Sequence, residues 1–390
     1  MNQNKYVFTQ VMDFIPHYQF NACIAKYQGH HRVKHFTCWE QFLSMSFGQL
    51  AYRESLRDIV LCLGSQKEKL YHLGFRSPVA RSTLSDANER RDWRIYRDFA
   101  QILIQEARRL YCDDKQFSLN LDGTFYVIDS TTIELCLSIF TWAQFRQTKA
   151  AVKLHTLMDL KGNIPTFFSI TSGKIHDVHF LDSIDWEVGA YYIMDRGYID
   201  YEKLYIVHQC GAFFIIRAKK NLSFKRLYSN PVDKNTGLRY DQVIRFSGHY
   251  TLKNYPEKLR RVKFFDKETD KSYVFLTNDF NIKAITVAEL YKNRWQIELF
   301  FKWIKHHLKI KTFWGHSTNA VKTQICIAIC AYLTVAIMKK KLQIQRNLSE
   351  ILQILNVSLF DKKPLDKLLS DIEPQKFDGA SQKQACLWDF

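Results

Sequence analysis

The 390-residue sequence predicts an α/β (α+β) protein in which an all-helical N-terminal part precedes a strand-rich part. Apolar residues recur at three- and four-residue spacing in 38–52, 55–63 and 84–111, as in amphipathic helices. From residue 125 the pattern changes to short β-branched and aromatic runs bounded by Gly, Asp or Asn. With 46% apolar and 15% aromatic residues, the chain is neither a disordered protein nor a small disulfide scaffold.

The N-terminal helices end in a long periodic segment, 84–111, that carries several arginines: Arg90, Arg91, Arg94 and Arg97. Short helices followed by an arginine-bearing helix are compatible with a helix-turn-helix reader of DNA. They are equally compatible with a helical bundle that has a solvated basic face. We expect this part to be a DNA-binding domain over residues 1–118.

The strand-rich part should form a sheet and then return to helix. The expected strands are 125–128, 153–157, 165–170, 191–194 and 212–216, followed by 242–246, 259–265 and 272–276 in a basic stretch. Helical periodicity resumes near residue 286. The apolar run 325–338 is about 14 residues long, whereas a membrane span needs about 20, so we expect a buried core helix and no membrane partner. The sequence shows neither an export signal nor a C-x-x-C pair, which predicts a cytoplasmic location.

Charge is distributed unevenly along the chain. The formal net charge of +17, from 56 Lys and Arg against 39 Asp and Glu, predicts a polyanionic partner. Residues 121–200 carry a net charge of −4, whereas residues 201–320 carry +13. The acidic stretch inside a basic protein suggests that some of its carboxylates have a chemical role.

Two expected strands end in the same way, with an aspartate straight after an apolar run. These residues are Asp129, after Tyr126-Val-Ile, and Asp195, after Tyr192-Ile-Met. An aspartate at the carboxyl end of a buried strand lies at the rim of the sheet, where α/β folds tend to bind ligands. A single such aspartate is more often a turn former, but two in one sheet favour a site.

The segment 289–309 lacks Gly and Pro and is expected to be one helix. At 100° per residue, its polar residues fall on a single stripe: Tyr291, Arg294, Glu298, Lys302, Lys305 and Lys309. The stripe is either a solvated face with i,i+4 ion pairs or a phosphate-binding surface that contains one metal ligand. Together, Asp129, Asp195 and Glu298 suit a hard divalent cation such as Mg²⁺.

The spacing Tyr291-x2-Arg294-x3-Glu298-x6-Lys305 resembles the Y-x2-R-x3-E-x6-K signature of bacterial DDE transposases of the insertion-sequence-four family. Asp129-Ser-Thr and Asp195-Arg-Gly-Tyr198 resemble its two aspartate motifs, and the first 110 or so residues resemble the N-terminal domain of one branch.

The resemblance implies a ribonuclease H-like catalytic core over 119–345 with a β-rich insertion at about 218–285, and a C-terminal helical segment and loose tail over 346–390. It implies two Mg²⁺ or Mn²⁺ ions on Asp129, Asp195 and Glu298. We expect DNA contacts from a further set: Tyr291, Arg294, Lys302, Lys305, Arg196 and Tyr198.

The resemblance further implies an enzyme that binds double-stranded DNA as a homodimer in the bacterial nucleoid. Family members cut the transposon free, often through a hairpin end, and join its 3′-hydroxyls to target DNA. An aromatic side chain of the insertion can then stack on a flipped base. Two alternatives remain: a DDE-type nuclease without strand transfer, and a non-catalytic repressor derived from a transposase. A loop group, His176-Asp177-x-His179, is either near the aspartates or an ordinary polar loop.

Overall fold

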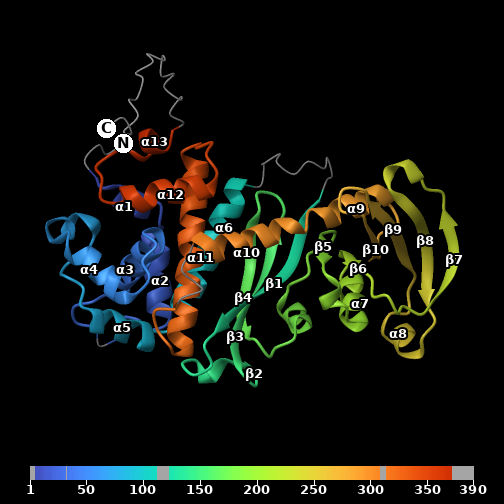
Figure 1. Ribbon diagram of the computed structural model, residues 1–390, viewed down its shortest axis with the longest axis horizontal. Coiled ribbons are helices and arrows are strands. Elements are labelled where there is room, and N and C mark those ends of the chain that lie inside the picture. Colours follow the sequence, from blue (N-terminus) through green and yellow to red (C-terminus); the bar gives the residue numbers. More distant parts are fainter. Residues whose placement is uncertain (1–4, 32, 112–122, 308–312, 371–390) are drawn as a thin grey trace, which may run out of the picture.

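The computed structural model describes all residues except 1–4, 32, 112–122, 308–312 and 371–390. Helices gather at one end, and a sheet runs from the middle of the molecule to the other end (Figure 1). The expected domain boundary near residue 118 and the loose tail expected at the end of 346–390 lie outside the described residues. The N-terminal helices are α1 (Val7–Met12), α2 (His17–Lys26), α3 (Cys38–Leu50), α4 (Leu56–Gly64), α5 (Arg81–Arg90) and α6 (Arg94–Tyr111).

Side-chain caps fix where several of these helices begin. Thr37 and Glu40 form a reciprocal capping box at the start of α3, and the Ser55 hydroxyl accepts the Asp58 N–H at the start of α4. The single helix expected over 84–111 is wrong, because Arg91 has an extended backbone between α5 and α6. Asp92 causes the restart, since its carboxylate accepts the Arg94 N–H at 2.9 Å.

Arg91 points into the protein, although the sequence placed it on a basic surface. Its guanidinium donates to the Thr37 carbonyl at 2.7 Å and to Gln41 Oε1 at 3.0 Å. These bonds tie the α5–α6 junction to α3, so this arginine serves packing of the helical bundle. Arg90 and Arg94 remain exposed.

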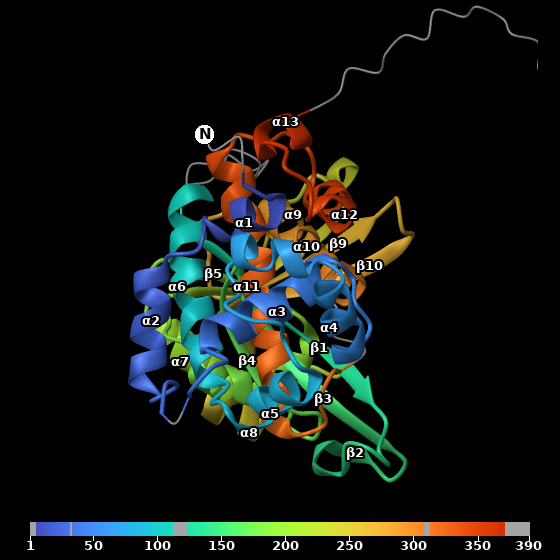
Figure 2. The ribbon, with the colours of Figure 1, turned by 90° about the vertical axis from the view of Figure 1, so that its left-hand side faces the viewer.

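The apolar helix expected around 325–338 is confirmed as a core element. It is part of α11 (Thr318–Lys341), which is long and apolar enough to cross a membrane, yet 94% of its most apolar window is buried inside the protein. Figure 2 shows α11 surrounded by the other helices, and it packs on α3, α5, α6 and α12. The last helices, α12 (Leu348–Ser358) and α13 (Leu365–Leu369), join the N-terminal bundle, since the Val7 and Phe8 amides donate to the Asp361 and Leu359 carbonyls.

A single mixed sheet of ten strands runs through the rest of the molecule, in the order β2-β3-β1-β5-β6-β10-β9-β8-β7, with β4 beside β3. β1 pairs antiparallel with β3 and parallel with β5, and β5 pairs parallel with β6. This is the ribonuclease H-like arrangement that the sequence implied. The strands are β1 (Phe125–Leu135), β2 (Gln144–Arg146), β3 (Lys149–Asp159), β4 (Ile164–Ser172), β5 (Tyr191–Met194), β6 (Phe213–Arg217), β7 (Phe224–Asn230), β8 (Leu238–Phe246), β9 (Leu259–Asp266) and β10 (Lys271–Thr277).

The two faces of the sheet bury separate cores, which explains the continuous apolar runs of β1 and β5. Phe125 and Val127 belong to the larger core, which also contains α9 (Ala284–Lys292) and α10 (Trp295–His307). Tyr126 and Ile128 belong to the smaller core on the opposite face, with α7 (Tyr201–Gln209). The parity of a residue in β1 therefore decides which layer its side chain reaches.

The insertion strands extend the same sheet rather than forming a separate one. β7 to β10, with α8 (His249–Asn254) between β8 and β9, continue outward from β6. The sequence did not predict β2 or β7. β7 is the edge strand and is mostly exposed, so it lacks the apolar alternation that would mark a strand.

Candidate active site

Asp129 lies within β1 and not at its end, which corrects the sequence-based prediction. β1 continues to Leu135 because β3 pairs with it along its whole length, and Asp129 lies opposite Thr156. The parallel pairing with β5, however, stops at Ile128 opposite Met194. On that side Asp129 therefore lies at the carboxyl end of the parallel ladder, where the sheet opens.

Asp195 follows β5 directly and precedes the short 3-10 helix η5 (Arg196–Tyr198). Because Ile128 pairs with Met194, Asp129 and Asp195 are next to each other across the β1–β5 ladder. Both continue the alternation of residues that face the larger core, where Tyr191 and Ile193 lie. The two aspartates thus face the layer that contains α9 and α10.

Glu298 comes from α10, and the helix expected over 289–309 is interrupted before it. α9 ends at Lys292, and α10 begins at Trp295. Asn293 explains the break, because its side chain donates to the Glu289 carbonyl at 2.9 Å and so competes with the helical bonding pattern. Tyr291 and Glu298 therefore lie on different helices, although they still approach the same site.

Arg294, in the turn between α9 and α10, links two of the three carboxylates. Its guanidinium lies 2.7 Å from Asp129 Oδ2 and 2.5 Å from Glu298 Oε1. The Tyr291 hydroxyl donates to Asp195 Oδ1 at 3.2 Å. Tyr291 and Arg294 thereby connect the signature to both aspartates, and the Arg294 guanidinium lies between Asp129 and Glu298.

The electrostatics of the cluster depend on how deeply each carboxylate is buried. The Asp129 side chain is 19% exposed and that of Glu298 56%. The pKa of Asp129 is raised to about 6, mainly by burial; Arg294 and the Ser130 N–H lower it, whereas the charges of Glu298 and Asp195 add to the increase. Burial also raises the pKa of Tyr291, so its hydroxyl stays a donor near neutral pH.

The donor chemistry of these three residues fits a hard divalent cation, since all are carboxylates. In the part of the chain that the structure describes, no group of three His, Cys, Asp or Glu side chains is already arranged to hold a metal ion. The guanidinium of Arg294 supplies the positive charge between Asp129 and Glu298. A metal on these carboxylates would replace that contact.

The residues expected to contact DNA fall into distinct environments. Lys302 and Lys305 line a cavity of about 410 Å³ together with Asp129 and Glu298, and Lys305 also donates to the Thr132 carbonyl at 3.0 Å. Arg196 is exposed beside Asp195. Tyr198 does not lie where a DNA contact was expected, because its side chain is only 2% exposed and packs in the smaller core.

A second cavity, of about 310 Å³, adjoins Glu298 on the side of the insertion. Trp295, 46% exposed at the start of α10, borders it. Three rings continue its wall: Tyr291, Phe275 and Tyr273, with Phe275 4.6 Å from Tyr291 and 6.1 Å from Tyr273 between ring centroids. The sequence does not identify the aromatic residue beside the carboxylates, because strands and helices that are distant in the chain form this cavity.

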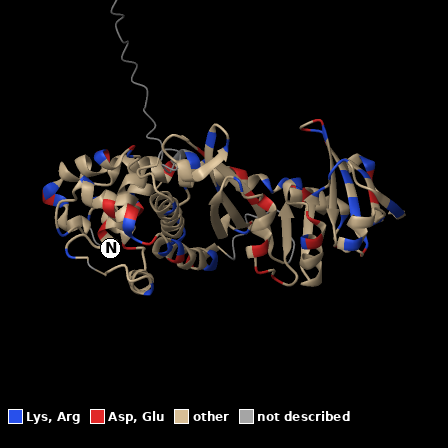
Figure 3. Cartoon of the chain, turned by 90° about the horizontal axis from the view of Figure 1, so that it is seen from below, with Lys and Arg blue, Asp and Glu red and all other residues tan. Residues whose placement is uncertain are grey.

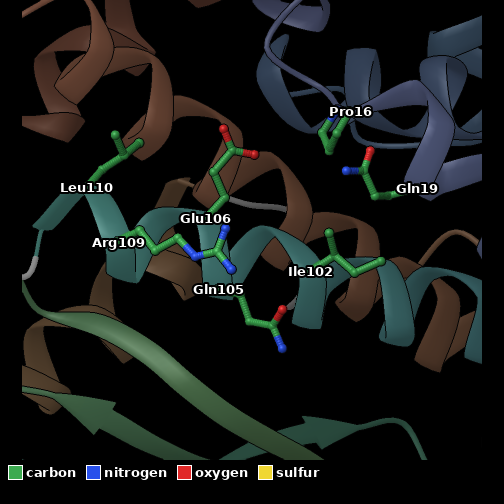
Figure 4. A pocket seen from close by; sticks show the side chains of 7 residues that line it. All are labelled: Pro16, Gln19, Ile102, Gln105, Glu106, Arg109 and Leu110. Atoms are coloured by element: carbon green, nitrogen blue, oxygen red, sulfur yellow. The ribbon is translucent and has the colours of Figure 1, made fainter.

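Basic side chains surround this acidic centre unevenly. Figure 3 shows Lys and Arg over the β7–β10 end, while Asp and Glu are prominent over the middle of the molecule. A different cavity, of about 640 Å³, lies in the helical part between α6 and the start of α2 (Figure 4). Its walls carry one carboxylate, Glu106, which is paired with Lys341, so it offers no comparable constellation.

Comparisons with known proteins show the family of this chain. A family model described as a transposase DDE domain matches residues 120–334, and a domain of unknown function matches residues 3–76. "Putative transposase y4zB" of Sinorhizobium fredii is 31% identical over 288 residues, which are 72% of this chain and 78% of that protein. "Putative transposase for insertion sequence element IS4SA" of Synechocystis is 26% identical and covers 66% of this chain and 71% of its own.

A solved structure is also similar in outline. The cryo-EM structure of the piggyBac transposase synaptic complex with hairpin DNA aligns with 96% of this chain and 85% of that chain. The TM-score is 0.46 and the sequence identity is 12%.

Proposed function

Since this chain belongs to the DDE transposase family, we propose that it cuts DNA at the ends of its own transposable element and joins the freed 3′-hydroxyl ends to target DNA. The observation that carries the proposal is the approach of Asp129, Asp195 and Glu298 from a central strand, a neighbouring strand end and a helix. A repressor derived from such a protein would need none of the three.

Asp129, Asp195 and Glu298 would hold two Mg²⁺ or Mn²⁺ ions. Bound there, the ions would supply activation of the attacking oxygen and stabilisation of the leaving oxygen in phosphoryl transfer. Arg294 would then leave Asp129 and Glu298 and turn its guanidinium to a phosphate, to which its two donor groups are suited. Lys302 and Lys305 border the same cavity and would hold the strand that carries the scissile phosphate.

The basic insertion would hold the remaining DNA. We place this protein in the bacterial cytoplasm, acting as a homodimer on paired transposon ends. The domain division proposed from the sequence fits the grouping of β7 to β10 beyond β6. Because phosphate contacts release counterions, binding to transposon ends should weaken steeply as salt increases.

Purified protein incubated with Mg²⁺, DNA that carries the element ends and a target plasmid tests this function. We expect nicks at the element ends and covalent joining of those ends to the plasmid, both read on denaturing gels. Cleavage without joining would favour the nuclease, and binding of the ends without any cleavage would favour the repressor.

Metal binding should weaken as the pH falls through about 6, the raised pKa of Asp129. A proton on this carboxyl must leave before an ion binds, so we expect Mn²⁺ binding to release roughly half a proton from Asp129 at pH 6 and almost none at pH 8. Calorimetry in two buffers of different ionisation enthalpy measures this release. Equal proton release at both values would contradict the prediction.

The same shift gives the metal-free protein a pH-dependent stability. The native state holds the Asp129 proton more tightly than the unfolded chain, whose pKa is near 3.8. The stabilisation of the folded state by the protonated Asp129 carboxyl is therefore fully present below pH 3.8 and is lost as the pH rises to about 6.

Trp295→Ala should impair the processing of a hairpin end more than the first nick. We propose that the cavity beside Glu298 receives a base displaced from the DNA end, which stacks on Trp295. Stacking is worth about 1–3 kcal/mol per base, so we expect roughly a 10- to 100-fold slower resolution of a pre-formed hairpin. A 2-aminopurine at the end base should lose the fluorescence change that reports flipping.

Tyr250→Ala is the matched control, since Tyr250 is 80% exposed on α8 and does not line this cavity. Trp295→Phe should restore most of the rate because it keeps a ring. If Trp295→Ala resolves the hairpin at the wild-type rate, stacking at this position is wrong.

A further inference from the structure

Ser130 connects the two faces of the sheet directly behind the carboxylate cluster. Its N–H donates to Asp129 Oδ1 at 2.8 Å, on the side of the cluster. Its hydroxyl donates to Asp177 Oδ1, also at 2.8 Å. Because successive side chains of a strand alternate, Asp177 lies behind the sheet when viewed from Glu298. One residue thus touches both carboxylates.

Asp177 is held by a cation of its own. Lys153 Nζ lies 3.1 Å from Asp177 Oδ1 and 2.9 Å from the Ile175 carbonyl, and its side chain is only 12% exposed. A partly buried carboxylate with a nearly buried lysine is a fixed arrangement, unlike the mobile ion pairs of an open surface. Asp177 begins η4 (Asp177–Ser183), the 3-10 helix after β4.

His155 also packs beside Asp177. It lies opposite Ser130 in the β1–β3 pairing and is fully buried, with Phe180 of η4 stacked on it at 5.2 Å. His155 Nδ1 is 3.8 Å from Asp177 Oδ1, and burial lowers the pKa of His155 to about 4, so the ring is neutral. Lys153 therefore supplies the positive charge, and His155 supplies packing.

The strand needs such an anchor at this point. Beyond Ile128, β1 has lost its pairing with β5 and is bonded to β3 alone. On this open side the Ser130 N–H bonds to Asp129 Oδ1 and not to a neighbouring strand. The bond from the Ser130 hydroxyl to Asp177 holds Ser130 on the opposite face and so restrains the N–H that Asp129 accepts.

We propose that Asp177 is a positioning residue, which acts through Ser130 to fix the orientation of the Asp129 carboxylate. The inference rests on the proposed function, since it assigns Asp129 to a metal. Ser130 bonds directly to the proposed ligand Asp129, and loss of such a partner typically changes metal affinity or activity 10- to 100-fold; Asp177 acts through it. The Asp177 of the His176-Asp177-x-His179 loop group thereby gains a role that the sequence left open.

The test compares Asp177→Ala and Ser130→Ala with wild type in two assays. The first is Mn²⁺ binding without DNA, followed by electron paramagnetic resonance. The second is single-turnover cleavage of end DNA at increasing Mg²⁺. We expect Mn²⁺ affinity to fall about 10- to 100-fold in both variants, and the Mg²⁺ concentration for half-maximal cleavage to rise correspondingly, with end-DNA affinity unchanged.

Additional variants separate positioning from folding. Asp182→Asn, a change of an exposed carboxylate on the same η4 helix, should match wild type in both assays. The double variant Ser130→Ala/Asp177→Ala should be no worse than either single variant, because both remove the same link. Ser130→Thr should recover part of the affinity, since it keeps the hydroxyl.

The outcomes distinguish this inference from the proposed function. If wild type cuts DNA and both variants bind Mn²⁺ and cut as it does, Asp177 is not a positioning residue. Fully additive losses in the double variant would overturn the relay as well. If wild type itself neither binds Mn²⁺ nor cuts, the proposed function is wrong.

Discussion

Asp129→Asn, Asp195→Asn and Glu298→Gln should each reduce cleavage at the element ends by about 10³-fold or more. Each change removes a charged metal ligand, and a metal that stabilises transition-state charge is worth several kcal/mol, with 1.4 kcal/mol for every factor of ten. The amide side chains keep the size of the originals, so the sheet and α10 should remain intact. Single-turnover cleavage on denaturing gels gives the rate.

The affinity for end DNA, unlike the cleavage rate, should not fall in these variants. Asp129→Asn removes one of the two carboxylate partners of Arg294 and one negative charge beside the proposed phosphate path, so affinity for end DNA should be maintained or increased. An electrophoretic mobility shift measures it. Asp185→Asn is the matched control, because Asp185 is exposed in the same acidic stretch and should leave both properties unchanged. Full cleavage by any one of the three site variants would show that the carboxylate assignment is wrong.

Asp241→Ala should destabilise the insertion by about 3–5 kcal/mol, the usual cost of breaking a buried ion pair. Asp241 and Arg260 are 4% and 6% exposed and join β8 to β9 through two bonds of 2.9 Å. Without Asp241 the guanidinium remains buried and unpaired. Arg260 also donates to the Ile282 carbonyl, just before α9. The loss of stability should therefore extend to α9, the helix that carries Tyr291.

Urea unfolding measures the overall loss, and hydrogen exchange shows whether β8 and β9 lose protection first. Asp13→Ala breaks an exposed pair with Lys5 and should cost less than about 1 kcal/mol. The double change Asp241→Leu with Arg260→Met should be milder than Asp241→Ala alone, since no charge is left buried. A loss as small as that of Asp13→Ala would contradict the prediction.

Much of this protein could be predicted from local sequence patterns. The core helix within α11 and the strands β1, β3 to β6 and β8 to β10 were visible because burial imposes a periodicity on the chain. The exposed edge strand β7 was not visible, since a strand without a buried face carries no alternation. The breaks at Asp92 and Asn293 depend on single polar side chains that bond to nearby backbone groups, a competition that periodicity does not detect.

The candidate site divides in the same way. Sequence patterns identify the candidate residues, because Asp129 and Asp195 follow apolar runs and Tyr291, Arg294, Glu298 and Lys305 have a characteristic spacing. These patterns do not determine where the side chains point. Tyr198, expected at the DNA, is buried, and Arg91 bonds to α3.

Contacts between segments that are distant in the chain bring the site residues together. The register of β1 with β5 brings Asp129 beside Asp195, and the turn after α9 directs Arg294 to two carboxylates at once. The pairing of β1 with β3 and the position of η4 bring Asp177 behind the site. Register and face depend on contacts between segments far apart in the chain, and shifting a strand by one residue would turn each side chain to the opposite face. Local periodicity carries no information about that choice.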